Sequence, residues 1–327
     1  MSFDVFGIGN TLVDIEAQVS DQTLEQLGYT KGLMTLVERD AQTGVLAALH
    51  AHPKHRCAGG SAANTILGLV GFGGRAAYAG KVGGDELGAF CLEDMRNAGV
   101  AIDVLPGEGA TGTCVVLITE DAQRTMLTHL GASSDLSSGD IDEQRILESK
   151  YIYVEGYLWT NDSTRATALH AIEFAAAHDV KIALTASDPF LITLFKDAFW
   201  DLIKGPVDLL FCNLEEARSL TGEQDAMACG RMLVEHADLV AVTMGGDGSI
   251  LFNGTDTIPI DGVAVDAVDT TGAGDMYAAG LLYGLTNGLT LQESGRLASH
   301  AAARVVSQLG ARLDQPFTTE EMLQLRD

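Results

Sequence analysis

The sequence predicts an α/β fold in which a mainly parallel sheet is flanked by helices and carries a small β-sheet lid. The first observation is that short apolar stretches alternate with helical stretches of about 10 to 15 residues, the pattern of βαβ units. The second is a β-rich run over 113–130 that interrupts this alternation. The third is size, because 327 residues with 46% hydrophobic residues can fill one large core.

The N-terminal half combines short strands with glycine turns and helices. Its run at 113–130 alternates in polarity and turns at Glu120-Asp121, which predicts a hairpin. In order, the predicted elements are a strand and a second extended segment within 3–19, a helix over 21–27, a strand over 32–37, a helix over 41–50, a glycine turn opening a helix within 58–74, and a strand, turn and helix within 76–100.

The C-terminal half is more regular. In order, its predicted elements are strands over 151–157, 180–187, 207–213 and 239–245, helices over 163–178, 189–203, 215–220 and 226–236, a hairpin over 248–260, and two closing helices. Because ligands of open α/β sheets bind at the carboxyl ends of the strands, we expect the lid to cover that edge. We therefore expect a single domain over 1–327, with lid segments near 11–37 and 101–130.

Charge and cysteine content limit the partners and the compartment. The formal net charge is −25, which argues against nucleic acid or an anionic membrane as a partner. The five cysteines form no C-x-x-C pair, and no apolar run approaches the roughly 18 residues of a membrane span. With no basic segment before its first strand, the chain is expected to lack a signal peptide and to be cytoplasmic.

The segment "DTTGAGD" at 269–275 combines two glycines with acidic residues just before an apolar helix. Free N–H groups at a helix N-terminus attract anions, and glycine lets a phosphate approach the backbone. A carboxylate there repels an anion, so Asp275 suits catalysis better than binding. It could take a proton from a hydroxyl that attacks phosphorus. The alternative is an aspartate that only favours the helix dipole.

Three motifs in order resemble those of the PfkB/ribokinase family of carbohydrate and nucleoside kinases. They are "AGGSAANT" at 58–65, "NLEE" at 213–216 and "DTTGAGD". The resemblance covers roughly 4–313. The stretches "GNTLVDIEA", "ATGTCVVLITEDAQRTMLTHLGA" and "VDLLFCNLEEA" look most like the adenosine kinase branch. The resemblance implies a ribokinase-like three-layer sandwich and an ATP-dependent kinase that uses Mg²⁺.

The resemblance also implies roles for individual residues. Asp275 would be the catalytic base, and the N–H groups of Gly272, Ala273 and Gly274 would hold the transition-state charge. Acceptor-binding residues would be Asp14, Gly59, Gly60, Asn64 and Tyr157. Nucleotide and Mg²⁺ residues would be Asn213 and Glu216 (acting through water), Arg124, Thr271 and Gly245. In some relatives the positions of Asp269 and Thr271 help bind a monovalent cation such as K⁺.

The acceptor stays open between a ribonucleoside, with adenosine preferred, and a free furanose such as ribose or fructose. Adenosine kinases usually place consecutive aromatics after a glycine, whereas this chain has Gly156-Tyr157-Leu158. A non-catalytic ligand-binding regulator is a further alternative, and a dehydrogenase lacks its fingerprint in the right context. Either a monomer or a homodimer is compatible.

Several candidate residues also have purely structural readings. Asn213 could cap a helix, Glu216 could be solvated, and Tyr157 could belong to the core. His50, His52 and His55 suggest metal binding, but we expect a polar loop there.

Overall fold

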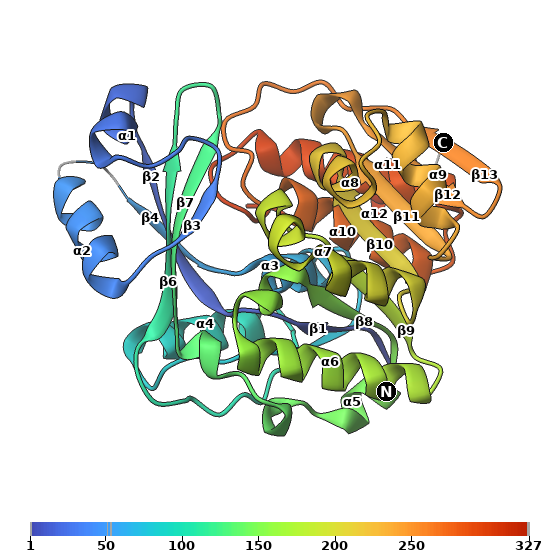
Figure 1. The fold of residues 1–327 in the computed structure, drawn as a ribbon, viewed down its shortest axis with the longest axis horizontal. Helices are drawn as coiled ribbons and strands as arrows, with labels where there is room; N and C mark the ends of the chain where they lie inside the picture. The colour runs from blue at the N-terminus through green and yellow to red at the C-terminus, as the bar shows by residue number, and fades with distance from the viewer. Residues whose placement is uncertain (1, 51, 53, 326–327) are drawn as a thin grey trace.

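Two β-sheets organise the chain, which the computed structural model describes over residues 2–50, 52 and 54–325 (Figure 1). The larger sheet has eight strands in the order β13-β12-β11-β10-β9-β8-β1-β5. Six of them run parallel, and β12 and β13 add an antiparallel hairpin at one edge. The strands are β1 (Phe3–Ile8), β5 (Ala76–Ala79), β8 (Ser149–Glu155), β9 (Lys181–Thr185), β10 (Leu209–Asn213), β11 (Leu239–Thr243), β12 (Ser249–Asn253) and β13 (Asp256–Ile260).

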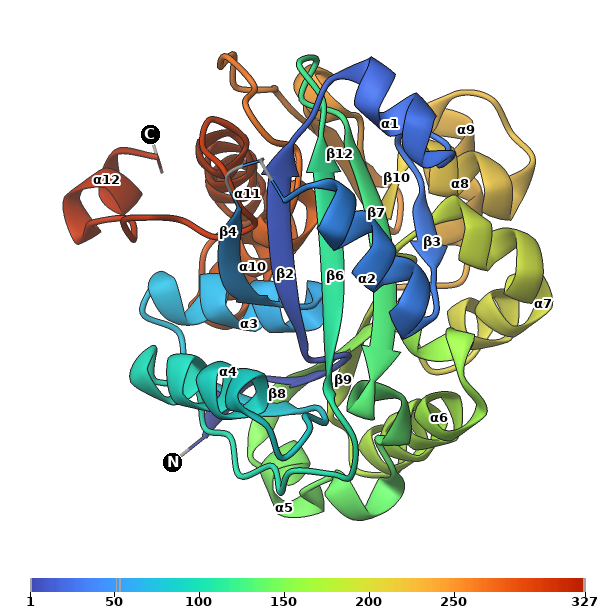
Figure 2. The ribbon, with the colours of Figure 1, turned by 90° about the vertical axis from the view of Figure 1, so that its left-hand side faces the viewer.

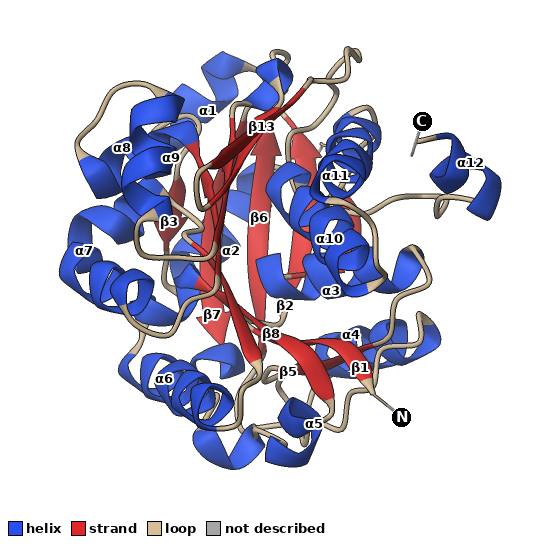
Figure 3. Cartoon of the chain, turned by 90° about the vertical axis from the view of Figure 1, so that its right-hand side faces the viewer, coloured by secondary structure: helices blue, strands red, loops and turns tan. Residues whose placement is uncertain are grey.

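Helices cover both faces of this sheet, which gives three layers (Figure 3). One layer contains α3 (Ser61–Gly71), α10 (Ala273–Thr286) and α11 (Leu291–Val306). The other contains α5 (Glu143–Leu147), α6 (Asp162–Ala177), α7 (Pro189–Lys204), α8 (Leu214–Thr221) and α9 (Ala226–Val234). The side chains of β10 alternate between the two faces of the sheet. Leu209 and Phe211 therefore pack in the hydrophobic core beneath the first helix layer, whereas Leu210 and Cys212 pack in the core beneath the second.

The smaller sheet, which we call the lid, has the order β3-β7-β6-β2-β4 (Figure 2). Its strands are β2 (Leu12–Gln18), β3 (Met34–Leu36), β4 (His55–Gly59), β6 (Thr111–Ile118) and β7 (Arg124–Gly131). The helices α1 (Asp21–Leu27) and α2 (Arg39–Ala48) accompany it, and the buried Gln42 of α2 donates to the carbonyls of Thr113 and Leu127. Two further helices are α4 (Glu86–Asn97), beside the lid, and α12 (Thr319–Gln324), near the C-terminus.

The predicted α/β fold with a second small sheet is confirmed, including the β6–β7 hairpin. The prediction of a loop at His55 was wrong, because His55 begins β4, which pairs antiparallel with β2. The segment His-Arg-Cys-Ala-Gly lacks apolar alternation, so pairing with β2 decides its conformation. All five cysteines are free thiols. Within the described ranges, no helix is both long and apolar enough to span a bilayer.

Candidate active site

The candidate site lies where α10 begins, and a glycine fixes that beginning. Gly272 is the N-cap of α10 and has φ +76°, a left-handed conformation. A Cβ there would lie 2.5 Å from the carbonyl oxygen of Ala311, so close packing also requires glycine. The chain therefore turns sharply into α10 with its first N–H groups at the mouth of the helix.

The buried Asp269 carboxylate holds the preceding loop. Its Oδ1 accepts hydrogen bonds from the N–H of Thr271 (2.9 Å) and from its hydroxyl (2.6 Å), and its Oδ2 accepts one from the N–H of Gly310 (2.9 Å). Thr271 is buried as well. In this structure the pair orders the loop that presents the helix N-terminus.

The space in front of α10 is open on the side of Gly274. Gly274 is exposed, and a Cβ there would meet no atom within 4 Å. The N–H of Ala273 makes one long bond, of 3.4 Å, to the carbonyl of Thr270. Backbone N–H groups with this access, reinforced by the helix dipole, can bind a phosphate.

Asp275 lies in the first turn of α10 and is fixed by the first turn of α3. Its Oδ1 accepts a hydrogen bond from the hydroxyl of Ser61 (2.6 Å), and its Oδ2 accepts one from Nδ2 of Asn64 (3.2 Å). Burial raises the pKa of Asp275 to about 6, although both hydrogen bonds lower it. The carboxyl group is thus oriented, and ionised at neutral pH.

We expect kcat/KM to rise as the pH increases through about 6 and then to level off. A general base acts in its ionised form, so if Asp275 has that role, activity should fall about tenfold per pH unit on the acidic side. Ser61→Ala removes a hydrogen bond to that form and should move the midpoint to higher pH. Initial rates between pH 4.5 and 8.5 test this; a rate that declines with rising pH across the range would contradict it.

Asp14 lies on β2 against Gly59, the last residue of β4. It is 5% exposed, and a Cβ at Gly59 would lie 2.1 Å from its Oδ2. Burial, followed by the charge of Glu16, raises the pKa of Asp14 to about 7. Its oxygens accept no hydrogen bond from any described residue. The next residue, Gly60, has φ +108°, and a Cβ there would lie 2.0 Å from the carbonyl oxygen of Asn10.

Asn64 faces the same region with one polar atom unused. Its Nδ2 donates to Asp275, whereas its Oδ1 is buried and has no partner among the described residues. A buried amide oxygen without a donor is costly, so this atom favours a ligand that brings a hydroxyl or N–H group. The structure thus brings Asp275, Asn64 and Ser61 together.

The lid reaches the same loop through its β6–β7 hairpin. Nη1 of Arg124 donates to the carbonyl oxygen of Thr270 (3.2 Å) and lies 3.4 Å from its hydroxyl oxygen. In return, the Thr270 hydroxyl donates to the carbonyl of Ala122 (3.0 Å). These bonds place a guanidinium beside the N-terminus of α10, although its present partners are protein oxygens.

Asn213 and Glu216 form a capping box at the start of α8. The Asn213 side chain accepts from the N–H of Glu216 (2.8 Å), and both Glu216 carboxylate oxygens accept from Asn213 (2.7 and 2.9 Å). Glu216 is buried, not solvated, and burial raises its pKa to about 7. Gly245 follows β11 with φ +59°, and a Cβ there would meet no atom within 4 Å.

Tyr157 is partly buried, and its hydroxyl donates to the carbonyl of Ser187 (3.1 Å). The following Leu158 and Trp159 are fully buried, and the Trp159 ring packs against Phe199 at 5.7 Å between centroids. The leucine after Tyr157 therefore faces the core.

Sequence reasoning missed two charged side chains around the site, the buried Glu155 and the partly buried Arg312. Glu155, at the end of β8, accepts from the N–H and Nδ2 of Asn10 and from the N–H of Ala62, each at 2.7 Å. It thereby fixes the start of α3. Arg312 bonds Asp94 and the carbonyl of Ala58, which places its charge near Asp14. Glu155 is the last residue of β8 and Arg312 lies in a loop, and neither belongs to a motif, so no pattern in the sequence indicated either.

The chain is similar in sequence and fold to several kinases. The adenosine kinase of Sinorhizobium meliloti is 36% identical, covers 99% of both chains and superposes with a TM-score of 0.92. A probable sugar kinase of Rhizobium etli is 34% identical over 97% of both chains, also with a TM-score of 0.92. The guanosine-inosine kinase of Escherichia coli is 30% identical over 75% of this chain and 58% of its own length.

The family model described as pfkB family carbohydrate kinase matches residues 32–318, nearly the whole chain. Together with an oriented carboxylate at an open helix N-terminus, this match identifies the chain as a kinase of the PfkB family.

Proposed function

We propose that the protein transfers the γ-phosphoryl group of ATP to the primary hydroxymethyl group of a ribonucleoside, with adenosine as the favoured acceptor. The observation that carries the proposal is the Asp275 carboxylate, held by Ser61 and Asn64 in the first turn of α10, beside the exposed Gly274. A carboxylate beside free backbone N–H groups suits a reaction in which a hydroxyl loses its proton while negative charge develops on a nearby phosphoryl group.

In the proposed mechanism, Asp275 accepts the proton of the acceptor hydroxyl as its oxygen attacks the γ-phosphorus. A bond forms between that oxygen and phosphorus, the bond from phosphorus to the β–γ bridging oxygen breaks, and ADP leaves. The N–H groups of Gly272, Ala273 and Gly274 stabilise the charge on the transferred group. The proton on Asp275 then passes to solvent. Arg124, beside Thr270, adds positive charge from the lid.

A magnesium ion fits the donor set at α8. Both oxygens of Glu216 already accept from Asn213, so the pair would hold Mg²⁺ through its water shell. When bound, Mg²⁺ neutralises phosphate charge, which matters in a chain of net charge −25. The buried Asp269 supports a monovalent cation such as K⁺ as a further part of the proposal, and rates with and without K⁺ measure that dependence.

A purine nucleoside is the favoured acceptor because two of the most similar proteins are described as adenosine and guanosine-inosine kinases. The second candidate is a free furanose. The Rhizobium etli neighbour, a probable sugar kinase, favours it, and so does a single aromatic, Tyr157, beside the core residue Leu158. The five free thiols support the cytoplasm as the proposed compartment.

A coupled ADP-release assay over a panel of nucleosides and sugars tests the proposal. Adenosine should give the highest kcat/KM, followed by other purine ribonucleosides. A preference for ribose or fructose would show that the acceptor is a free furanose and not a nucleoside. Absence of acceptor-dependent ADP release across the panel would refute the proposed function in both forms.

Asp14→Ala should raise the acceptor KM roughly 10- to 100-fold with a smaller change in kcat, because a charged hydrogen bond contributes about 1.5–3 kcal/mol. The reason is that the Asp14 carboxylate, which accepts no hydrogen bond from a described residue, can accept from two neighbouring ribose hydroxyls. A 2′,3′-dideoxynucleoside provides the matched control in a double-mutant cycle. Equal losses for the ribo and dideoxy acceptors would remove Asp14 from diol binding.

A further inference from the structure

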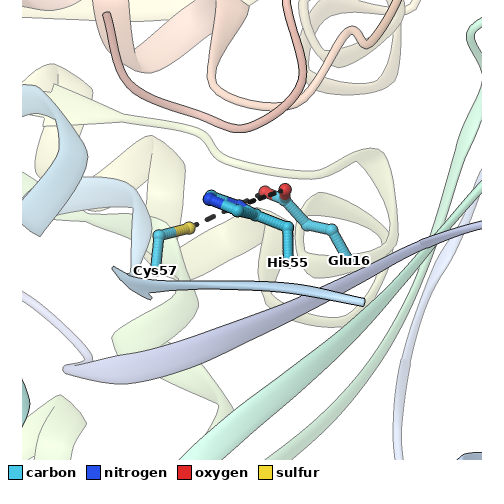
Figure 4. Close-up of side chains that lie close together, drawn as sticks. All are labelled: Glu16, His55 and Cys57. Carbon is cyan, nitrogen blue, oxygen red and sulfur yellow. Dashed lines mark hydrogen bonds and ion pairs between the residues drawn. The ribbon is translucent and has the colours of Figure 1, made fainter. Parts of the chain in front are cut away.

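Three potential metal ligands that belong to none of the kinase motifs meet on one face of the lid. Glu16 lies on β2, directly opposite His55 of β4, and Cys57 lies two residues further along β4 (Figure 4). His55 Nδ1 is 3.1 Å from Glu16 Oε2, and Cys57 Sγ is 3.7 Å from Glu16 Oε1. The three ligand atoms all lie within 4.8 Å of one another. Strand pairing therefore fixes a glutamate, a histidine and a cysteine around one point.

We propose that Glu16, His55 and Cys57 form a binding site for a transition-metal ion of the Zn²⁺ class. Bonds of about 2.0–2.3 Å in a tetrahedral zinc site place ligand atoms about 3.3–3.7 Å apart. The separations of 3.1 Å from His55 Nδ1 to Glu16 Oε2 and 3.7 Å from Cys57 Sγ to Glu16 Oε1 lie near that range. Because all three ligand atoms lie within 4.8 Å of one another, side-chain rotations would complete the set. The side chain of His55 is 62% exposed, so an ion can enter and a water can complete the tetrahedron.

The charge around the cluster also favours a cation. The Glu16 side chain is 2% exposed and faces Gly310, whose N–H donates to the buried Asp269. Its hydrogen bonds come from His55 and Cys57, which are both neutral when His55 is unprotonated. A buried carboxylate without a fixed positive partner is costly, and a divalent ion would compensate it.

The donor set selects the class of ion. A thiol and an imidazole are soft or borderline ligands that suit zinc, whereas Mg²⁺ takes oxygen ligands and keeps its waters. On binding, the metal displaces the Cys57 thiol proton, which passes to solvent as the sulfur–metal bond forms. The site therefore differs from the Mg²⁺ site proposed at α8, and ATP-Mg²⁺ should not compete for it.

A metal at this point would join β4 to β2. These strands carry Gly59 and Asp14, which pack against each other at the acceptor side. A metal that binds the folded protein and not the unfolded chain stabilises the folded state by mass action. The melting temperature should therefore rise with metal concentration. The site is thus a means of fixing the edge strand of the lid.

Titration of the full-length, tag-free protein with Co²⁺ in the presence of millimolar Mg²⁺ tests the proposal. We expect one equivalent to bind with a thiolate-to-cobalt charge-transfer band, and Zn²⁺ to displace it. Cys57→Ser should abolish the band. His55→Ala should lower the affinity for Co²⁺ by more than roughly 10- to 100-fold, which is the loss when a residue that is hydrogen-bonded to a metal ligand is removed. His50→Ala, an exposed histidine on the same segment, is the matched control and should bind normally.

Three results would overturn the proposal. The first is a protein that shows no charge-transfer band at micromolar Co²⁺. The second is a band that survives in Cys57→Ser, and the third is a band that disappears with excess Mg²⁺, because each of these two places the ion elsewhere. Circular dichroism of each variant separates loss of ligand from loss of folding. All these readouts are made without substrate, so they do not depend on the proposed kinase activity.

Discussion

Replacing Asp275 with asparagine is expected to lower kcat by about 10²–10⁴-fold, the range that general-base catalysis supplies. The amide has nearly the shape of the carboxylate, and it can accept from Asn64 while donating to the Ser61 hydroxyl. It cannot take the acceptor proton. ATP affinity should change little, because the N–H groups of α10 remain in place. Steady-state kinetics combined with calorimetric ATP titration measure the two effects separately.

Asp266→Asn is the matched control for this substitution. Asp266 is exposed, lies three residues before Asp269 and is outside the site. The control removes one negative charge from the same segment and should keep full activity. Near-normal turnover in Asp275→Asn would remove Asp275 from the role of base, whereas equal losses in both variants would point to a general charge effect.

Much of the fold could be predicted because periodicity and turn chemistry are local. Helix 21–27 has the predicted bounds, and helices α6 and α7 begin and end within one residue of theirs. Strand β4 could not be predicted, because His55 and Arg56 have no apolar pattern and owe their conformation to pairing with β2. Strand pairing between distant segments is the information that a single local pattern lacks.

In the candidate site, too, local features could be predicted from the sequence and contacts between distant residues could not. The motif "DTTGAGD" predicted a helix N-terminus with glycines at its mouth, and α10 begins there. The motif gave no information on hydrogen bonds between residues far apart in the sequence, such as those from Ser61 to Asp275 and from the N–H of Ala62 to Glu155. Asn64 illustrates the limit, since its side chain supports Asp275 directly, a contact that the motif alone did not indicate.

Alanine at Gly272 and at Gly274 should have opposite effects on folding, although the two residues are neighbours in one motif. Gly272→Ala forces a Cβ into a left-handed conformation and to 2.5 Å from the Ala311 carbonyl oxygen. Strain of this kind costs about 1–3 kcal/mol before the backbone contact is counted. The melting temperature and the activity should therefore fall together. Gly288→Ala, with φ +79° and no atom within 4 Å, measures the conformational cost alone.

Gly274→Ala separates the phosphate site from the fold. No atom lies within 4 Å of the new Cβ, and alanine favours a helix over glycine by about 1 kcal/mol, so stability should be kept or increased. The methyl group nevertheless occupies the space through which a phosphate would approach the backbone. We expect kcat/KM for ATP to fall at least about tenfold, equivalent to about 1.4 kcal/mol of transition-state stabilisation. A stable Gly274→Ala enzyme with full activity would show that the γ-phosphate does not contact this backbone.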